Sequence, residues 1–178
     1  YNVERVEALK GPNAMIFGRG GGGGVVNRVT KEAGFQGQRA FTLQGGRFGN
    51  KRVTGDFDQP LSGKAAFRLN GMYENSDSFR SGVGLERTGV NPTLTYLPND
   101  RTKLTASYEF FHDTRVADRG ITSFQGRAVP VDPSTYYGNP NDSHGPAEVH
   151  LGTTLVEKRM GRFTVRKRRP FGDCERLT

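Results

Sequence analysis

The sequence has no tryptophan, a single cysteine and no long run of apolar residues. The one cysteine, Cys174, has no partner in the chain, so a disulfide-stabilised scaffold is excluded. Only 33% of the residues are hydrophobic, and no stretch approaches the roughly 20 apolar residues that a membrane-spanning helix needs. The composition is compatible with membrane-spanning strands, because each needs only about 9–11 residues with alternate positions apolar.

An evenly basic surface is also missing. The formal net charge is +8, but residues 157–178 hold eight basic and three acidic residues, which leaves only +3 for the rest of the chain. A basic face for nucleic acid is therefore not predicted. A nucleic-acid binder would have to rely on Arg19 and residues 166–169, and its affinity would fall steeply with salt.

What the chain does contain favours strands and turns. It has 25 glycines, 12 phenylalanines and 6 tyrosines. Alternating segments separated by turns predict strands; they cover residues 36–44, 51–58, 65–74, 84–96, 103–111, 149–158 and 162–166. In the third segment Phe67 and Leu69 alternate with Arg68 and Asn70. The prediction is a mainly β chain of antiparallel strands.

Alternation of this kind fits two architectures. In a soluble sandwich the apolar face packs on a second sheet, whereas in an outer-membrane barrel it faces lipid and the polar face lines the lumen. Short turns at 59–64 and 97–101 alternate with longer loops at 75–82 and 113–148. Since short turns on one side and long loops on the other are typical of outer-membrane barrels, the pattern favours the barrel.

The first 31 residues have a different organisation. Residues 3–10 alternate like a strand, Gly11 and Pro12 break it, and a glycine cluster precedes a second strand at 25–30. Gly18, Gly20 and Gly23 satisfy the spacing of a dinucleotide fingerprint. Phosphate binding is not predicted, because it needs the glycine loop to open a helix, and here a strand follows.

The run ERVEALKGPNAMIFGRGGGGGVVNRVTK (residues 4–31) resembles the end of the plug domain of TonB-dependent outer-membrane receptors. That family's plug reads as an ER-V-E-hydrophobic-basic-GP run, an aromatic-Gly pair, a glycine pair and an asparagine, then Thr or Ser followed by Lys. The resemblance implies that residues 1–33 are the C-terminal part of a plug domain. Residues 34–178 would be the first antiparallel transmembrane strands of a β-barrel. Seven strands make that barrel incomplete, since plugged transporters close at about 22.

The resemblance also implies a function and a location. The family takes up ferric siderophores across the bacterial outer membrane, with energy from a TonB-type coupling protein that grips an N-terminal box. That box and an export signal are expected upstream of Tyr1, because the chain begins inside a pattern. The alternatives are a truncated, non-functional receptor fragment and a soluble β-rich binding module.

Ligand-binding candidates come from the same resemblance. The pieces DRGI and STYYGNPND in loop 113–148 resemble the third extracellular loop of siderophore receptors, particularly the catecholate type. Ferric siderophores are bulky and often anionic, so aromatic faces and cations are expected around them. The candidates are Phe17 near the plug apex with Arg19, and Arg119, Tyr136 and Tyr137 in the loop. For each of these residues, the alternative to ligand binding is a purely structural role.

Three charged residues are candidates for contacts between plug and barrel or within the plug. Glu4, Arg5 and Glu7 sit at positions where family members form ion pairs with the barrel wall. A plug inside a lumen needs such partners, because unpaired buried charge is costly.

Catalytic chemistry is not predicted. The three histidines lack metal-ligand spacing, and no serine lies in a nucleophile elbow. The sequence therefore predicts no enzyme activity, no metal site and no cofactor, with a ferric siderophore as ligand and outer-membrane lipid as surroundings.

The end of the chain departs from all of these patterns. Residues 167–178 include Lys-Arg-Arg-Pro and end near Cys174, where the family continues with alternating aromatic and polar residues. We interpret 167–178 as an atypical tail, and a frameshifted or truncated reading frame is the hypothesis that accounts for it. Sequencing the coding DNA tests this hypothesis.

Overall fold

The computed structural model describes residues 1–11 and 23–176, and strands make up its regular structure. The strands are β1 (Val3–Lys10), β2 (Gly24–Thr30), β3 (Gln38–Gly45), β4 (Lys51–Ser62), β5 (Ala65–Asp77), β6 (Gly84–Asn99), β7 (Thr102–Arg115), β8 (Ser123–Phe124), β9 (Arg127–Ala128), β10 (Ala147–Met160) and β11 (Phe163–Arg176). Within these described ranges, no helix has the length and apolar character needed to cross a membrane.

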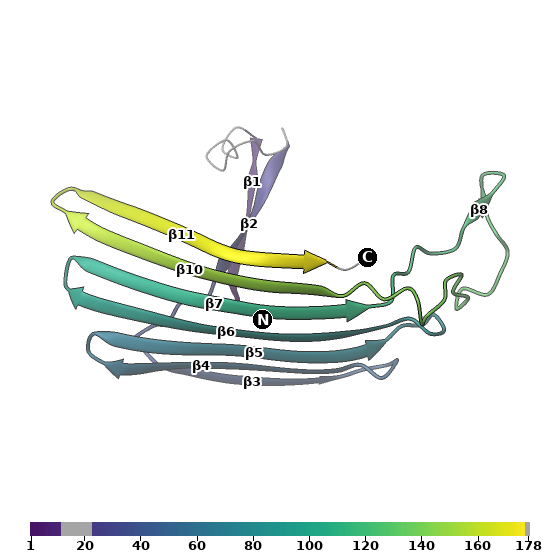
Figure 1. Ribbon diagram of the computed structural model, residues 1–178, viewed down its shortest axis with the longest axis horizontal. Helices are drawn as coiled ribbons and strands as arrows, with labels where there is room; N and C mark the ends of the chain where they lie inside the picture. The colour runs from purple at the N-terminus through teal and green to yellow at the C-terminus, as the bar shows by residue number, and fades with distance from the viewer. Residues whose placement is uncertain (12–22, 177–178) are drawn as a thin grey trace.

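Seven strands form one curved antiparallel sheet in the order β11-β10-β7-β6-β5-β4-β3 (Figure 1). The tight turns at one end have local causes. Ser62 Oγ accepts from the backbone nitrogens of Lys64 (3.2 Å) and Ala65 (3.1 Å), and Asn99 Oδ1 accepts from Arg101 N (3.0 Å). The seven alternating segments of the sequence are thus confirmed as the strands of one sheet. Its edges, β3 and β11, are open in the described chain, so the barrel is incomplete.

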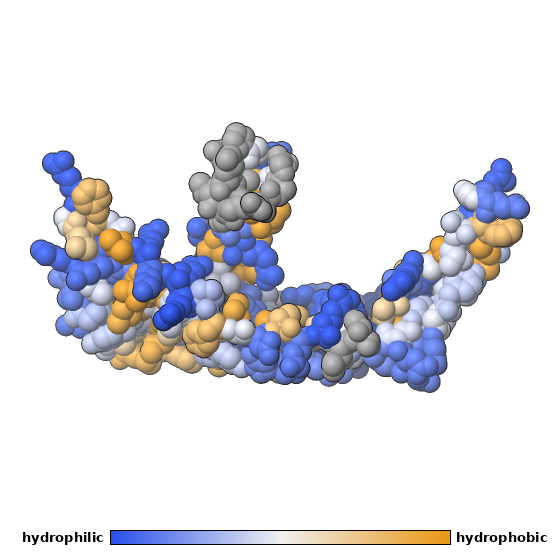
Figure 2. All heavy atoms as spheres, turned by 45° about the horizontal axis from the view of Figure 1, so that its top comes forward, coloured by the Kyte–Doolittle hydropathy of each residue, from blue (hydrophilic) through white to orange (hydrophobic). Residues whose placement is uncertain are grey.

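The two faces of this sheet differ in polarity. In β5 the burial alternates residue by residue, and the buried positions are mostly polar. The buried polar set of the sheet is Asp56, Asp58, Arg68, Asn70, Glu74, Ser76, Asn91, Thr93, Thr95, Thr105 and Asp113. The exposed large hydrophobic side chains of the sheet include Phe41, Leu43, Phe57, Leu69, Tyr73, Leu94, Tyr96 and Tyr108. Figure 2 shows hydrophobic residues along the lower edge of the sheet, away from the projecting hairpin.

This polarity is the reverse of that in a soluble domain, where apolar side chains fill the core. The described ranges contain no second large sheet to cover the apolar face, which argues against the soluble sandwich. An outward apolar face and an inward polar face are the arrangement of outer-membrane barrels.

Strands β1 and β2 form a separate antiparallel hairpin, with Lys10 opposite Gly24 and Val3 opposite Thr30. The hairpin lies on the polar face of the sheet. Tyr1 packs there above Gly89, where an added Cβ would lie 2.7 Å from the tyrosine ring. The Tyr1 hydroxyl is 3.4 Å from Glu109 Oε1, and burial followed by the Glu109 charge raises the Tyr1 pKa above its ordinary value. Gly89 therefore makes room in the seven-stranded sheet, called the wall below, for the aromatic side chain of Tyr1.

The structure refines three sequence boundaries. The hairpin ends at Thr30 and β3 begins at Gln38, with Ala33 (4% exposed) in the connection between them. The long loop covers 116–146, slightly less than the predicted 113–148. The polar alternation ends near Arg166, but β11 stays paired with β10 to Arg176. Pairing continues because the hydrogen bonds between strands come from the backbone, and only Pro170 lacks an N–H to donate.

Candidate functional site

The hairpin is held to the wall by ion pairs around Asp56 of β4. The Asp56 side chain is 9% exposed, and its carboxylate lies between two cations. Lys31 Nζ donates from the end of the hairpin at 2.7 Å, and Arg68 of β5 donates through Nε and Nη2, each at 2.8 Å. The wall residue Asp56 is therefore shared by a hairpin cation and a neighbouring strand.

Arg68 extends the network back to the hairpin. Its Nη1 donates to the backbone oxygen of Glu32 (3.0 Å) and lies 3.6 Å from the Glu4 carboxylate. The Glu32 side chain pairs with Lys103 of β7 at 2.6 Å. Each of these charges has an opposite partner, which offsets the cost of removing it from water. Sequence reasoning named Glu4 as a candidate contact and placed Asp56 and Arg68 on polar strand faces, but it did not connect them with one another or with Lys31, Glu32 and Lys103.

The three predicted plug–barrel residues behave differently from one another. Glu4 reaches the wall through Arg68. Arg5 donates to Glu7 at 2.7 Å, and Glu7 also accepts from Asn27 at 2.8 Å, so this pair lies inside the hairpin. The Asn27 hydrogen bond, and after it the Arg5 hydrogen bond, holds the Glu7 pKa below its ordinary value. Two ligand candidates, Phe17 and Arg19, lie outside the described residues.

The other three ligand candidates line one hollow. Arg119, Tyr136 and Tyr137 belong to the long loop and surround a hollow of about 540 Å³. The Tyr136 hydroxyl donates to the Ala117 carbonyl at 3.1 Å, which closes the two halves of the loop on each other. Tyr137 is 51% exposed. Tyr136 thus anchors the loop, and Tyr137 presents its ring to solvent at the hollow that Arg119 also lines.

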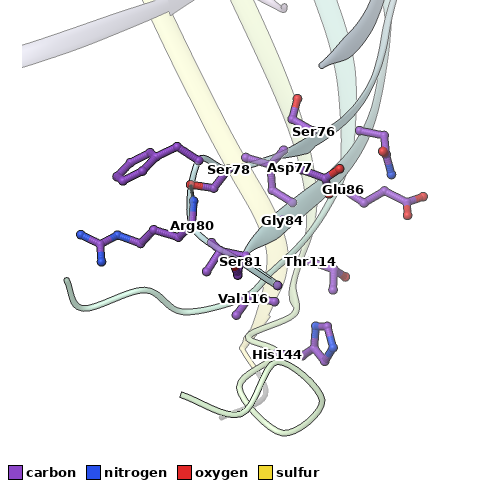
Figure 3. Close-up of a pocket in the computed structure, with 15 residues that line it drawn as sticks. Ser76, Asp77, Ser78, Arg80, Ser81, Gly84, Glu86, Thr114, Val116 and His144 are labelled. Carbon is purple, nitrogen blue, oxygen red and sulfur yellow. Dashed lines mark hydrogen bonds between the residues drawn. The ribbon is translucent and has the colours of Figure 1, made fainter. Parts of the chain in front are cut away.

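A second hollow of about 560 Å³ adjoins the base of this loop (Figure 3). It is lined by residues 75–86, which comprise the end of β5, the connection at 78–83 and the start of β6, and by Thr114, Val116 and His144. His144 lines both hollows, so they are neighbours. The β5–β6 connection had no functional prediction from sequence.

Below the loops, the polar face carries a ladder of charges across four strands. Arg52, Glu74, Arg87 and Asp113 are successive cross-strand partners in the register. Arg52 and Arg87 lie 3.4 and 3.8 Å from the Glu74 carboxylate, and Arg87 Nε donates to Asp113 at 2.9 Å. Arg115 Nε also donates to Asp113 at 2.8 Å. Three arginines against two carboxylates leave this ladder positive.

A hollow of about 450 Å³ separates the ladder from the hairpin. Tyr1 and Arg28 line it from the hairpin side, and the sheet contributes Arg52, Glu74, Arg87, Glu109 and Phe111. The lining therefore has two aromatic rings and three arginines against two carboxylates, which leaves it slightly positive.

The histidines form no metal site. Within residues 1–11 and 23–176, no group of three or more His, Cys, Asp or Glu side chains has the geometry to hold a metal ion. His112 and His150 instead approach the same Glu148 carboxylate, at 3.3 and 2.8 Å.

The chain is similar in sequence and fold to receptors of the bacterial outer membrane. Over 142 residues the chain is 32% identical to the metal-pseudopaline receptor CntO of Pseudomonas aeruginosa, covering 79% of this chain and 20% of that protein. Over 134 residues it is 31% identical to the ferrioxamine receptor of Yersinia enterocolitica, covering 75% and 18%. The chain is a relative of the TonB-dependent siderophore receptors.

Solved receptors of this family share the fold. The siderophore receptor PiuA of Acinetobacter baumannii superposes with a TM-score of 0.92 at 24% identity, covering 99% of this chain and 26% of PiuA. The open form of the ferric-catecholate import receptor Fiu of E. coli K12 gives 0.89 at 25% identity, covering 99% and 29%. No family model matches the chain. The chain spans about a fifth of the length of the curated receptors it matches.

Proposed function

We propose that this chain is the part of a TonB-dependent receptor that joins the plug to the first barrel strands. The whole receptor would take up a ferric siderophore across a bacterial outer membrane. One observation carries the proposal: a hairpin with plug-like sequence is ion-paired to the polar face of a sheet whose apolar face is exposed. The relatives that share this sequence are receptors named for metal or iron chelates.

In this proposal the ligand contacts come from the long loop and the plug. Arg119 supplies positive charge and Tyr137 supplies an exposed ring beside it. Phe17 and Arg19 are assigned to the plug side by the family resemblance alone. A chelate with aromatic edges and negative charge is stabilised by such aromatic and cationic neighbours.

Catecholate chelates are the favoured class. Their rings are planar, and three deprotonated catechols around Fe³⁺ leave a negative complex, which suits Arg119 and the positive ladder on the wall. Support comes from the DRGI and STYYGNPND pieces and from the similarity to Fiu, a ferric-catecholate import receptor.

In this function the protein binds and transports its ligand, with no catalytic step, cofactor or nucleic-acid partner. Its partners would be the ferric siderophore, a TonB-type energy-coupling protein and the lipid of the outer membrane. The apolar face of β3–β7 supports the lipid contact.

Ligand binding by the purified full-length receptor tests the proposal. We expect saturable quenching of intrinsic fluorescence by a ferric catecholate and a weaker response to ferrioxamine B. Arg119→Ala and Tyr137→Ala should each weaken binding by about tenfold, since a desolvated cation or stacked ring contributes roughly 1–2 kcal/mol. Arg47→Ala, in the exposed β3–β4 turn, is the control. If neither chelate binds at micromolar concentration, the proposed function is wrong.

A further inference from the structure

Arg80, in the connection between β5 and β6, binds both halves of the long loop. Its Nε lies 2.8 Å from a carboxylate oxygen of Asp118, near the start of the loop. Its Nη1 donates to the backbone oxygen of Thr135, in the second half, at 3.0 Å. The side chains of Arg80 and Asp118 are only 12% and 24% exposed. One guanidinium therefore joins two loop segments that lie 17 residues apart in the sequence.

Neighbours of Arg80 contact the same loop. Ser81 N donates to the Ser134 oxygen at 3.0 Å. Gly82 has a positive φ of 74°, and a Cβ there would lie 2.6 Å from Pro140 Cγ. Arg80, Ser81 and Gly82 thus form a continuous contact surface for the long loop.

The loop residues that Arg80 contacts are sequence neighbours of the candidate ligand residues. Asp118 precedes Arg119, and Thr135 precedes Tyr136 and Tyr137. A guanidinium makes these two contacts at once because its donors form a rigid fork, which an ammonium group lacks. Burial of most of the Arg80–Asp118 pair keeps it from being screened as an exposed ion pair would be.

We propose that Arg80 is a positioning residue that fixes the long loop and sets the placement of Arg119, Tyr136 and Tyr137 for ligand binding. The positioning of the loop stands on the contacts above, whereas its effect on ligand rests on the proposed function. Arg80 itself lies outside the hollow that these three residues line.

Cleavage of the unliganded full-length receptor by trypsin tests the positioning. The loop contains trypsin sites at Arg119 and Arg127. Arg80→Ala should speed cleavage at both sites by about tenfold, as expected for loss of a charge-assisted pair. Arg80→Lys should give an intermediate rate, because it keeps the charge and loses the fork. Arg47→Ala should leave the rate unchanged.

Two further variants separate this role from a general loss of folding. Gly82→Ala should speed cleavage without any change of charge, because its Cβ pushes against Pro140. The pair Arg80→Asp with Asp118→Arg should restore part of the protection of Arg127 that either single change removes. This rate is read at Arg127 alone, because Asp118→Arg adds a trypsin site beside Arg119. Heat-modifiable migration on gels checks that each barrel is intact. An unchanged cleavage rate in Arg80→Ala would overturn the proposal.

Ligand binding adds the second readout. Arg80→Ala should raise the Kd for a ferric catecholate by about tenfold, whereas Arg47→Ala should not. Normal affinity in an Arg80→Ala receptor with fast cleavage would overturn the ligand part of the proposal. If the wild-type receptor binds no ferric chelate, the proposed function fails, and the cleavage rates still decide whether Arg80 positions the loop.

Discussion

At the scale of single residues, Asp56 joins the hairpin to the wall. It accepts from Lys31 on one side and Arg68 on the other, and Arg68 also reaches Glu4 and the backbone of Glu32. Because the network is mostly buried, the loss of one member leaves a charge with too few partners.

Asp56→Ala should destabilise the full-length receptor by about 3–5 kcal/mol, the usual cost of breaking a buried pair from one side. Urea unfolding in detergent micelles measures the change. Asp100→Ala, in the exposed β6–β7 turn, should change stability by less than about 0.5 kcal/mol. Equal stability of the two variants would show that the network does not hold the hairpin.

The Glu7 carboxyl group gives a prediction for the pH dependence of stability. Hydrogen bonds from Asn27 and then Arg5 hold its pKa below the ordinary value. A group with a depressed folded-state pKa stabilises the fold above its unfolded-state pKa, and loses that effect as pH falls through the folded-state pKa. Carboxyl NMR of the full-length receptor should show a low Glu7 pKa that rises in Asn27→Ala. An equal pKa in both proteins would contradict the hairpin geometry.

At the scale of strands, alternation decides which side chains face outward. In β6, Leu94 and Thr88 lie on the same face, six residues apart. Leu94 is 44% exposed on the apolar face, between its cross-strand partners Phe67 and Ala106. The account places Leu94 in lipid and Thr88 toward the outer end of the strand.

Leu94→Arg should therefore cost about 2–4 kcal/mol, and Thr88→Arg about 0–1 kcal/mol, because the cost of arginine in a barrel depends on depth. Unfolding of each full-length variant from lipid vesicles measures the difference. Equal costs at the two sites would mean that the apolar face of β6 does not lie in a bilayer.

Strand β11 carries two cations on this outward face. Lys167 pairs with Val156, and Arg169 pairs with Thr154. If β11 lies in the bilayer like its neighbours, replacing both cations by leucine should stabilise the full-length receptor by a few kcal/mol in the same vesicle assay. Unchanged stability would place this part of β11 outside the lipid.

Pattern and resemblance predicted the strands and the hairpin because both depend on local sequence. Two-residue alternation marks strands such as β5, and the residues 4–31 motif marks the plug. The Lys31–Asp56–Arg68 network was not predictable, since it depends on how the hairpin lies across β4 and β5. Arg80 was missed for the same reason, because its partners are 38 and 55 residues away in sequence. Pairing of 167–176 was missed because polarity changes there while backbone hydrogen bonds continue.

At the scale of the whole molecule, the described sheet has two open edges, β3 and β11. Unpaired strand edges are not tolerated in lipid, and plugged transporters close at about 22 strands. The account therefore requires further strands to close the barrel, in keeping with the fifth of each curated receptor that this chain spans.

Uptake of radioactive iron into cells tests the central claim most directly. The full-length receptor is expressed in a strain that lacks its own siderophore receptors and is given iron as a ferric catecholate. We predict accumulation that depends on the receptor and stops when the TonB-type coupling protein is deleted. Accumulation equal to that of cells without the receptor, with the protein present in the outer membrane, would contradict the account.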